Sequence, residues 1–193
     1  TLYAYRIGST SLAEGYIIFT QEQEQIRIRD WALLTSSAAR RLWTFLADHR
    51  SQIKEVTWWG SPVNPFVLLL PEQSPTLVKQ TNWMLRIIDL PAALIKRGYP
   101  LGIEAELHLD IQDDLLPANN SKFCLQVSQG KGVVIQGGNG DFQLDIRHLA
   151  SLYTGFLSPI QLKQLNYLQA TPAALATASL IFSGDRPWMA DFC

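Results

Sequence analysis

The sequence has little of what nucleic-acid binding, membrane association or an extracellular disulfide scaffold would require. Its 16 lysines and arginines are balanced by 17 aspartates and glutamates, which gives a formal net charge of −1. This balance gives no basis for a nucleic-acid or membrane-surface partner, so we expect neither. No apolar run reaches the roughly 18 residues that a membrane-spanning helix needs.

Cysteine and histidine are also scarce. The two cysteines, Cys124 and Cys193, are too few for a disulfide framework, so a reducing, cytoplasmic setting is the default expectation. The histidines His49, His108 and His148 have no ligand spacing with a second histidine or cysteine, so we expect no metal site. A Gly-x-Ser-x-Gly motif is absent too, which leaves a hydrolase triad without support.

Two short glycine-rich stretches, residues 130–132 and 137–140, invite comparison with phosphate-binding loops. Such a loop follows a strand and opens a helix, so that amide groups and the helix dipole converge on the anion. Here predicted strands flank both stretches. Hairpin turns are therefore the better interpretation, and we expect no cofactor to bind at either place.

The chain is organised around the stretch Trp83–Tyr99. Its first part, residues 83–88, is rich in bulky and β-branched side chains and predicts a buried strand. Asp89 suits a helix N-cap, and Pro91 suits the first turn, where its missing N–H costs nothing. Gly98 can take the left-handed conformation that ends a helix. We expect a strand, a turn and a short helix, with a domain boundary just before them.

The residues before this stretch predict a small α/β layer unit that spans residues 1–80. The expected order is β-β-β-α-β, with Thr35 as the N-cap of the helix. The predicted elements are a hairpin at 2–7 and 14–20, a strand at 26–34, a helix to about residue 49, and a strand at 53–59. Residues 66–70 form a short apolar stretch that fits a helix or a strand equally well.

The residues after it predict an antiparallel sheet followed by helices that cover it, an α+β arrangement that spans residues 81–193. The clearest strand is residues 101–109, where apolar side chains alternate strictly with polar ones or glycine. Further strands are expected at 123–127, 133–136 and 142–146. Helices are expected at 147–156, at 159–167 with Ser158 as cap, and at 172–182 with Thr171 as cap.

The aromatic residues and the end of the chain each allow two interpretations. The six tryptophans fit core and interface packing, and an aromatic pocket for a cationic group is the alternative. The last eight residues, 186–193, include Trp188 and Phe192. Termini usually fray unless they are held down. We therefore expect this tail to pack against the protein and to half-bury the terminal carboxylate of Cys193; simple tail packing is the plainer interpretation.

Taken together, Trp83–Tyr99, the upstream residues 14–18 and 33–46, and the tail resemble the Eis-type (enhanced intracellular survival) bacterial N-acetyltransferases. Members of this family have an N-terminal GNAT domain that binds acetyl-CoA, a degenerate GNAT-like domain, and a domain with the sterol-carrier-protein fold. The resemblance implies that residues 1–80 are the second part and residues 81–193 the third. The domain that binds acetyl-CoA is then expected to be absent from this chain.

The resemblance also implies roles for individual residues. The terminal carboxylate of Cys193 would be the general base of acetyl transfer to a primary amine, on a small molecule or a lysine-type substrate. Trp83, Asp89, Trp188 and Phe192 would belong to the substrate-binding surface, although Asp89 has a plainer role as a helix cap. Family members are oligomers, so a homo-oligomer is expected.

Two other function classes fit the same sequence. One is a stand-alone carrier that binds an apolar small ligand between the sheet of residues 101–146 and its helices. The other is a purely structural oligomerisation module. The coding sequence upstream of Thr1 distinguishes them, because a strand, a glycine-rich loop and a helix there favour the enzyme, whereas a start codon directly before Thr1 favours the carrier.

Overall fold

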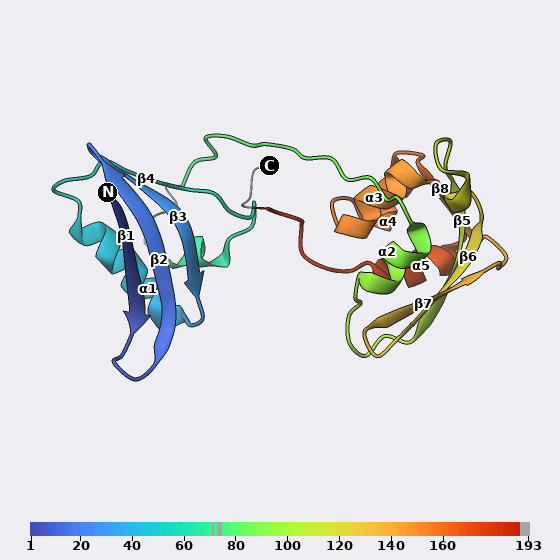
Figure 1. Cartoon of the computed structure of the whole chain (residues 1–193), viewed down its shortest axis with the longest axis horizontal. Coiled ribbons are helices and arrows are strands. Elements are labelled where there is room, and N and C mark those ends of the chain that lie inside the picture. Colours follow the sequence, from blue (N-terminus) through green and yellow to red (C-terminus); the bar gives the residue numbers. More distant parts are fainter. Residues whose placement is uncertain (71, 73–74, 190–193) are drawn as a thin grey trace. The chain divides into compact units, whose positions relative to one another are not determined.

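The structure is a computed structural model of the 193-residue chain, and it describes residues 1–70, 72 and 75–189. The chain divides into two compact units (Figure 1). Residues 1–80, with Trp188 and Met189 of the described tail, form the first, and residues 81–187 form the second. Among the described residues, no helix is both long and apolar enough to cross a membrane.

The first unit is a four-stranded sheet in the order β1-β2-β3-β4. Strands β1 (Leu2–Gly8), β2 (Ala13–Glu22) and β3 (Gln25–Leu33) are antiparallel. Helix α1 (Ser36–Asp48) then returns the chain so that β4 (Glu55–Trp58) pairs with β3 in parallel. The predicted β-β-β-α-β order is confirmed.

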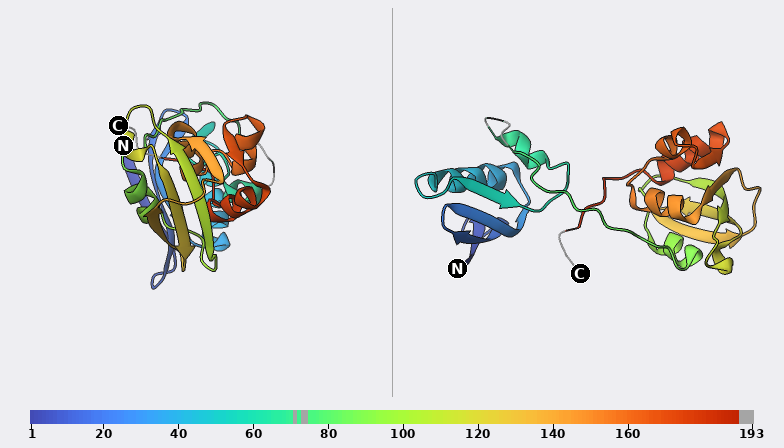
Figure 2. Two further views of the ribbon diagram at one scale, coloured as in Figure 1. Left: turned by 90° about the vertical axis from the view of Figure 1, so that its right-hand side faces the viewer. Right: turned by 90° about the horizontal axis from the view of Figure 1, so that it is seen from above.

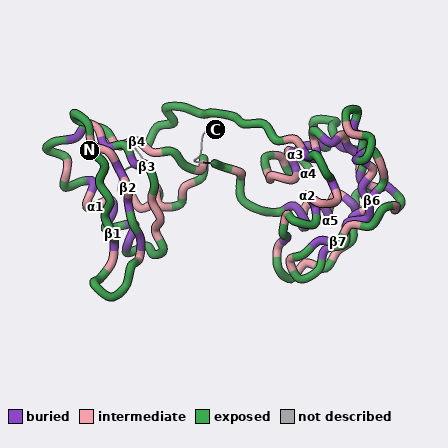
Figure 3. Tube along the Cα trace, in the orientation of Figure 1, coloured by how far each residue is buried: buried purple, intermediate pink, exposed green. Residues whose placement is uncertain are grey.

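Helix α1 lies against one face of this sheet (Figure 2). The side chains of Ile17, Phe19 and Ile26 pack there against Leu42 and its helix neighbours. As predicted, Thr35 is the N-cap, because its side chain accepts the amide of Ala38. The undecided stretch at 66–70 overlaps a 3₁₀ helix, η1 (Pro65–Leu69). Figure 3 shows that β1, at the sheet edge, is largely exposed.

The second unit is a five-stranded sheet in the order β7-β6-β5-β8-β9. Its strands are β5 (Ala105–Gln112), β6 (Lys122–Ser128), β7 (Lys131–Gln136), β8 (Phe142–Asp145) and β9 (Leu168–Ala170). The expectation of an antiparallel sheet is wrong at one place, because β5 and β8 pair in parallel. After edge strand β7, the chain crosses the sheet so that β8 lies on the other side of β5 from β6. Strand β9, which the sequence did not predict, pairs with β8 and forms the other edge.

Four helices gather on one face of this sheet (Figure 1). They are α2 (Leu90–Lys96), α3 (Ile146–Thr154), α4 (Pro159–Gln164) and α5 (Pro172–Ile181), and a 3₁₀ helix, η2 (Pro117–Asn119), lies between β5 and β6. The predicted caps Ser158 and Thr171 both bind the first turn of their helices, and Ser158 forms a full capping box with Gln161. Side-chain caps therefore define where these helices begin.

Two predicted strands need correction. The strand predicted at 101–109 begins four residues later, and Leu101 is 84% exposed in a turn. The predicted face is right, since Leu107 and Leu109 are buried beneath the helices. Residues 83–88 form no strand at all. Side-chain contacts hold that segment in place instead, which a pattern of bulky and β-branched residues cannot show.

Candidate functional site

Asp89 stands at the N-terminus of α2, where the sequence placed it. Its Oδ1 atom accepts the amide of Ala92 at 2.9 Å, and its backbone is extended, with φ −125° and ψ 104°. Pro91 occupies the first turn, and Gly98 follows the helix with φ +75°. The predicted cap is therefore confirmed. Asp89 is also exposed, so its carboxylate is open to solvent, and its assignment to substrate binding stays a prediction.

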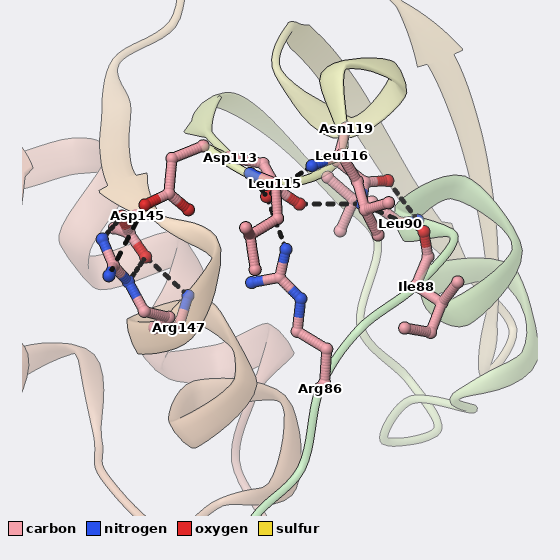
Figure 4. A network of polar contacts seen from close by, with 10 residues as sticks. Arg86, Ile88, Leu90, Asp113, Leu115, Leu116, Asn119, Asp145 and Arg147 are labelled. Atoms are coloured by element: carbon pink, nitrogen blue, oxygen red, sulfur yellow. Dashed lines mark hydrogen bonds and ion pairs between the residues drawn. The ribbon is translucent and has the colours of Figure 1, made fainter.

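The backbone on both sides of Asp89 is held by a buried amide side chain, Asn119 (Figure 4). Its Oδ1 atom accepts the amide of Leu90 at 2.9 Å, and its Nδ2 atom donates to the carbonyl of Ile88 at 3.1 Å. The same Nδ2 donates to Asp113 Oδ2 at 3.0 Å. A buried amide that satisfies two backbone groups fixes the turn, since leaving either group unpaired would be costly.

Asp113 continues this network, and its side chain is fully buried. Its Oδ1 atom accepts the amides of Leu115 and Leu116, each at 3.0 Å, and forms an ion pair with Arg86. Burial alone would raise the pKa of Asp113. The hydrogen bonds from Asn119, from both amides and from Arg86 outweigh burial and hold its pKa well below the ordinary value. We call Arg86, Asp113 and Asn119 the Asp113 network.

Asp113 and Asn119 lie between the strands predicted at 101–109 and 123–127, and the sequence interpretation gave no role to the Asp113 network. A signal was present, because aspartate and asparagine around a proline favour turns in which their side chains bind nearby backbone groups. The partner Arg86 lies 27 positions away along the chain. That distance is why no local pattern joins it to the loop.

Beside the network, Arg147 binds the Asp145 carboxylate through two nitrogens, Nε at 2.7 Å and Nη2 at 2.6 Å (Figure 4). Its Nη1 atom lies 3.8 Å from Asp114 Oδ2. The hydrogen bonds from Arg147 lower the pKa of Asp145. The Arg147 side chain is 63% exposed, so solvent screens this pair and its contribution to stability is small.

Arg97, just after α2, lies among three aromatic rings. Its guanidinium carbon is 5.4 Å from the ring centre of Tyr99, 5.9 Å from that of Tyr153 and 5.0 Å from that of Phe182. Its Nε atom donates to the carbonyl of Tyr153 at 2.9 Å. Burial lowers the pKa of Arg97, and the favourable contact of a cation with ring faces offsets part of that cost. The cation that these rings bind is thus the protein's own.

Five of the six tryptophans fall into two groups. Trp31, Trp43 and Trp58 pack against one another in the first unit, with ring centres 5.8 to 6.3 Å apart, and Trp43 Nε1 donates to the carbonyl of Phe66. These contacts match the packing interpretation. The two predicted substrate-binding tryptophans are exposed instead: Trp83 is 42% exposed, in the second unit, and Trp188 is 52% exposed, in the first.

The remaining predicted site residues, Phe192 and Cys193, lie outside the described residues. The roles assigned to them from the family resemblance therefore stay predictions.

The connection from β3 to α1 is the place in the first unit where a strand leads directly into a helix. Here the hydroxyl oxygen of Thr35 accepts a hydrogen bond from the amide of Ala38. Without this bond, the amide could bind an anion at the start of the helix. The sequence contains no glycine from residue 16 to residue 59, so the connection and the start of α1 lack the glycine that lets a phosphate group come close to the backbone. The stretch at 130–132 belongs to the hairpin of β6 and β7, as predicted, although Lys131 and Gly132 already lie in β7. The hairpin predicted at 137–140 is wrong, because this stretch joins β7 to β8, which are not neighbours in the sheet.

One group of side chains has the composition of a metal site. The ligand atoms of Glu106, His108 and Cys124 all lie within 4.8 Å of one another on β5 and β6. The expectation of no metal site used spacing along the chain, which cannot show that two neighbouring strands bring His108 and Cys124 together.

Comparison with known proteins divides the chain at nearly the same place as its two units. A model of the GNAT acetyltransferase domain matches residues 1–87, and a model of the sterol carrier protein domain matches residues 90–190. An uncharacterized N-acetyltransferase from Streptomyces griseus is 33% identical over 171 residues, which cover 85% of this chain and 40% of that protein.

Solved structures that resemble the chain include two further proteins with informative names. A GCN5-related N-acetyltransferase from Anabaena variabilis is 54% identical, with a TM-score of 0.96, and the match covers 100% of this chain and 51% of that one. Eis1 from Mycobacterium abscessus is 24% identical with a TM-score of 0.72, over 92% of this chain and 48% of that one, and this likeness shows the fold alone. The chain thus spans about half the length of these solved relatives, and less of the curated one.

Proposed function

Since this chain belongs to the sterol carrier protein domain family over its second half and carries a GNAT acetyltransferase domain before it, we propose that it is part of an acetyl-CoA-dependent N-acetyltransferase of the Eis type. The observation that carries this proposal is that both domain models match this chain, in this order, and that two N-acetyltransferases resemble the chain over most of its length. The fold that the chain shares with Eis1 is consistent with this proposal.

We propose that acetyl-CoA binds to a part of the full-length enzyme outside this chain. The β3–α1 connection supports this, because Thr35 already satisfies an amide of the first helical turn and the connection itself contains no glycine. A helix N-terminus binds pyrophosphate only when its amides are free and the backbone can come close. This chain would then contribute to binding and deprotonating the amine substrate.

The chemistry of acetyl transfer explains why the end of the chain is the proposed catalytic group. The nitrogen of the amine must be neutral to attack the acetyl carbonyl, yet alkyl amines have a pKa of about 10.4 and are protonated at neutral pH. A base within hydrogen-bond reach must therefore take the proton. The α-carboxylate of Cys193 would do so, and an apolar setting next to Trp188 and Phe192 would raise its pKa from about 3.5 toward a useful value.

The substrate is proposed to be a primary amine on a small molecule or a lysine side chain. Trp83, Asp89, Trp188 and Phe192 would line its pocket, with Asp89 offering a negative charge to an ammonium group. The exposure of Trp83, Asp89 and Trp188 leaves them available for this. As in the family, we propose that the enzyme works as a homo-oligomer.

The alternative, a carrier for an apolar ligand, draws no added support from the second unit. The space between its sheet and helices is occupied by buried side chains, among them Leu109, Leu125, Phe142 and Leu149, each fully buried. An apolar ligand would have to displace this packing, and interiors at native density resist such changes. The enzyme proposal therefore remains the better supported one.

The test uses three variants of the full-length protein. Cys193→Ala should keep most of the activity, because the main-chain carboxylate is unchanged. Deleting Cys193, or adding a few residues after it, should lower kcat for an amine substrate by about 100-fold or more, in line with the loss of a general base. Acetyl-CoA affinity, measured by calorimetry, should stay the same. If the extended enzyme turns over like the unmodified one, the carboxylate is not the base.

A further inference from the structure

The face of the second sheet that the helices do not cover carries its own cluster of polar side chains. On β5, Leu107 and Leu109 point to the core, so the residues between them point to the open face. The pairing of β5 with β6 places His108 opposite Cys124 and Glu106 opposite Gln126. Cross-strand neighbours on one face have Cβ atoms about 5 Å apart, close enough for their side chains to share a ligand.

The side chains on this face already converge on one carboxylate. His108 Nε2 lies 2.8 Å from Glu106 Oε1, and Gln126 Nε2 donates to Glu106 Oε2 at 2.8 Å. These bonds, with one from Cys124, lower the pKa of Glu106. Cys124, opposite His108 on β6, is buried. In the absence of a cation, three groups thus direct protons at Glu106.

A thiolate, an imidazole and a carboxylate are a donor set that zinc accepts. Bonds of about 2.0 to 2.3 Å to a tetrahedral Zn²⁺ place its ligands about 3 to 4 Å apart. The ligand atoms of Glu106, His108 and Cys124 are all within 4.8 Å of one another, so a small movement of side chains suffices. We propose that these three residues form a Zn²⁺ site on the open face of the sheet, with the fourth position left to water.

Binding balances as the exchange of one proton for the metal. Cys124 gives up its thiol proton to solvent and becomes a thiolate ligand, while Glu106 is already charged. His108 binds through Nε2, so its ring proton moves to Nδ1. The net change is one proton released for each Zn²⁺ bound, with no change in oxidation state.

The loop at residues 137–140 must respond to this proton shift. The amide of Asn139 donates to His108 Nδ1 at 3.3 Å, which holds the ring proton on Nε2 in the metal-free protein. This hydrogen bond is long compared with the usual 2.9 to 3.0 Å, so losing it costs little. Gly138, at φ +109°, gives the peptide before Asn139 the freedom to rotate and to turn a carbonyl toward Nδ1. A Cβ atom there would lie 2.5 Å from Nδ1, so glycine is needed in any case.

The experiment uses the 193-residue chain with Cys193→Ser, so that Cys124 is the only thiol. Titration calorimetry with Zn²⁺ should give one equivalent bound and one proton released, with affinity rising about tenfold per pH unit while the thiol is protonated. Cobalt(II) in place of zinc should give a thiolate-to-metal absorption band. The amide resonances of residues 137–140 should shift on binding, which simple surface binding would not produce.

Variants decide whether these three residues are the ligands. Glu106→Gln, His108→Asn and Cys124→Ala should each weaken Zn²⁺ affinity by about 30-fold or more. The reason is that even the loss of a residue that only hydrogen-bonds to a ligand lowers metal affinity by about 10- to 100-fold. The matched controls Glu104→Gln and His148→Asn should leave it unchanged. Thermal unfolding without metal checks that each variant folds, and Cys124→Ser replaces Cys124→Ala if that one does not. Equal Zn²⁺ affinity in the reference chain and in a folded Cys124 variant overturns the proposal.

Discussion

The two units cover one face of a sheet in different ways. In the second unit, four helices and the Asp113 network enclose a core in which Leu90, Leu109 and Phe142 are completely buried. In the first, a single helix covers the sheet, and edge strand β1 leaves Leu2 64% and Tyr5 49% exposed. Apolar residues clustered on an exposed edge are typical of a surface that contacts another part of a protein. Each unit therefore has a buried core of its own, and the units differ in how many helices cover the sheet.

The units also differ in how charge supports the fold. The described carboxyl groups whose pKa lies below the ordinary value are Glu106, Asp113 and Asp145, and all of them belong to the second unit. In the first unit, the shifted group is Tyr16, whose hydroxyl donates to Asp30 and whose pKa is raised. Acid should therefore weaken the second unit more directly than the first.

The largest effect that separates the units should come from a charge placed in the second core. Leu107 is 1% exposed on β5, so Leu107→Asp buries an unpaired carboxylate and should cost about 3 kcal/mol or more in the unfolding free energy of the second unit. Hydrogen exchange at the amides of β5 and β6 should become much faster, whereas exchange in β2 and β3 should stay the same. Chemical denaturation followed by exchange measures both units at once.

The matched control lies on the same stretch of chain. Glu104→Lys changes an exposed charge just before β5 and should alter stability by less than about 0.5 kcal/mol. Equal melting temperatures for Leu107→Asp and Glu104→Lys would contradict the register of β5. Loss of protection in β2 and β3 as well would show that the two units unfold together.

An intermediate effect should come from acid. A group whose pKa is lower in the folded than in the unfolded state stabilises the fold above its unfolded pKa, about 3.9 for aspartate, and that stabilisation is lost as the pH falls. The buried carboxylate of Asp113 is such a group. The denaturation midpoint of the second unit should therefore begin to fall below about pH 5, fall most steeply below about pH 3.9, and fall further than that of the first unit.

Asp113→Asn tests whether this carboxylate is responsible. The variant should be less stable at neutral pH, because Arg86 loses its charged partner, and its stability should depend less steeply on pH. Asp114→Asn, at an exposed position with a distant contact to Arg147, is the control and should keep the original slope. An unchanged slope in Asp113→Asn would assign the acid sensitivity to other groups.

The sequence predicted those parts of the fold that local patterns determine. Alternation located the core face of β5, and polar residues before apolar runs located the caps Thr35, Asp89, Ser158 and Thr171. It placed strand ends poorly, because alternation continues into the turn at Leu101, where no neighbouring strand pairs. It also missed β9, whose three residues are too few to show a period.

Local sequence patterns could not predict contacts between residues that lie far apart along the chain. Arg86 meets Asp113, and His108 meets Cys124, only because the fold brings their elements together. Neither pair has a spacing that a linear motif could reveal. Among the substrate-site residues, Asp89 was correctly placed as a cap because capping is local. The role of Cys193 rests on family resemblance, which local patterns do not test.

The smallest effect should distinguish the structural role of Asp89 from its proposed contact with the amine. As a cap, Asp89 can be replaced by serine, which also accepts an amide hydrogen bond at the start of a helix, whereas alanine cannot. Asp89→Ala should therefore cost about 1 kcal/mol in the stability of the second unit, and Asp89→Ser a few tenths.

Kinetics of the full-length enzyme complete this test, because both variants remove the negative charge. If Asp89 binds the ammonium group of the substrate, KM should rise several-fold and to the same extent in Asp89→Ala and Asp89→Ser. An equal rise in KM would show that the lost charge is responsible, because the two variants differ in stability. If Asp89 serves only as the cap, KM should follow stability, unchanged for Asp89→Ser and raised, if at all, for Asp89→Ala. A normal KM in both variants would remove Asp89 from the substrate site and leave its hydrogen bond to Ala92 as its function.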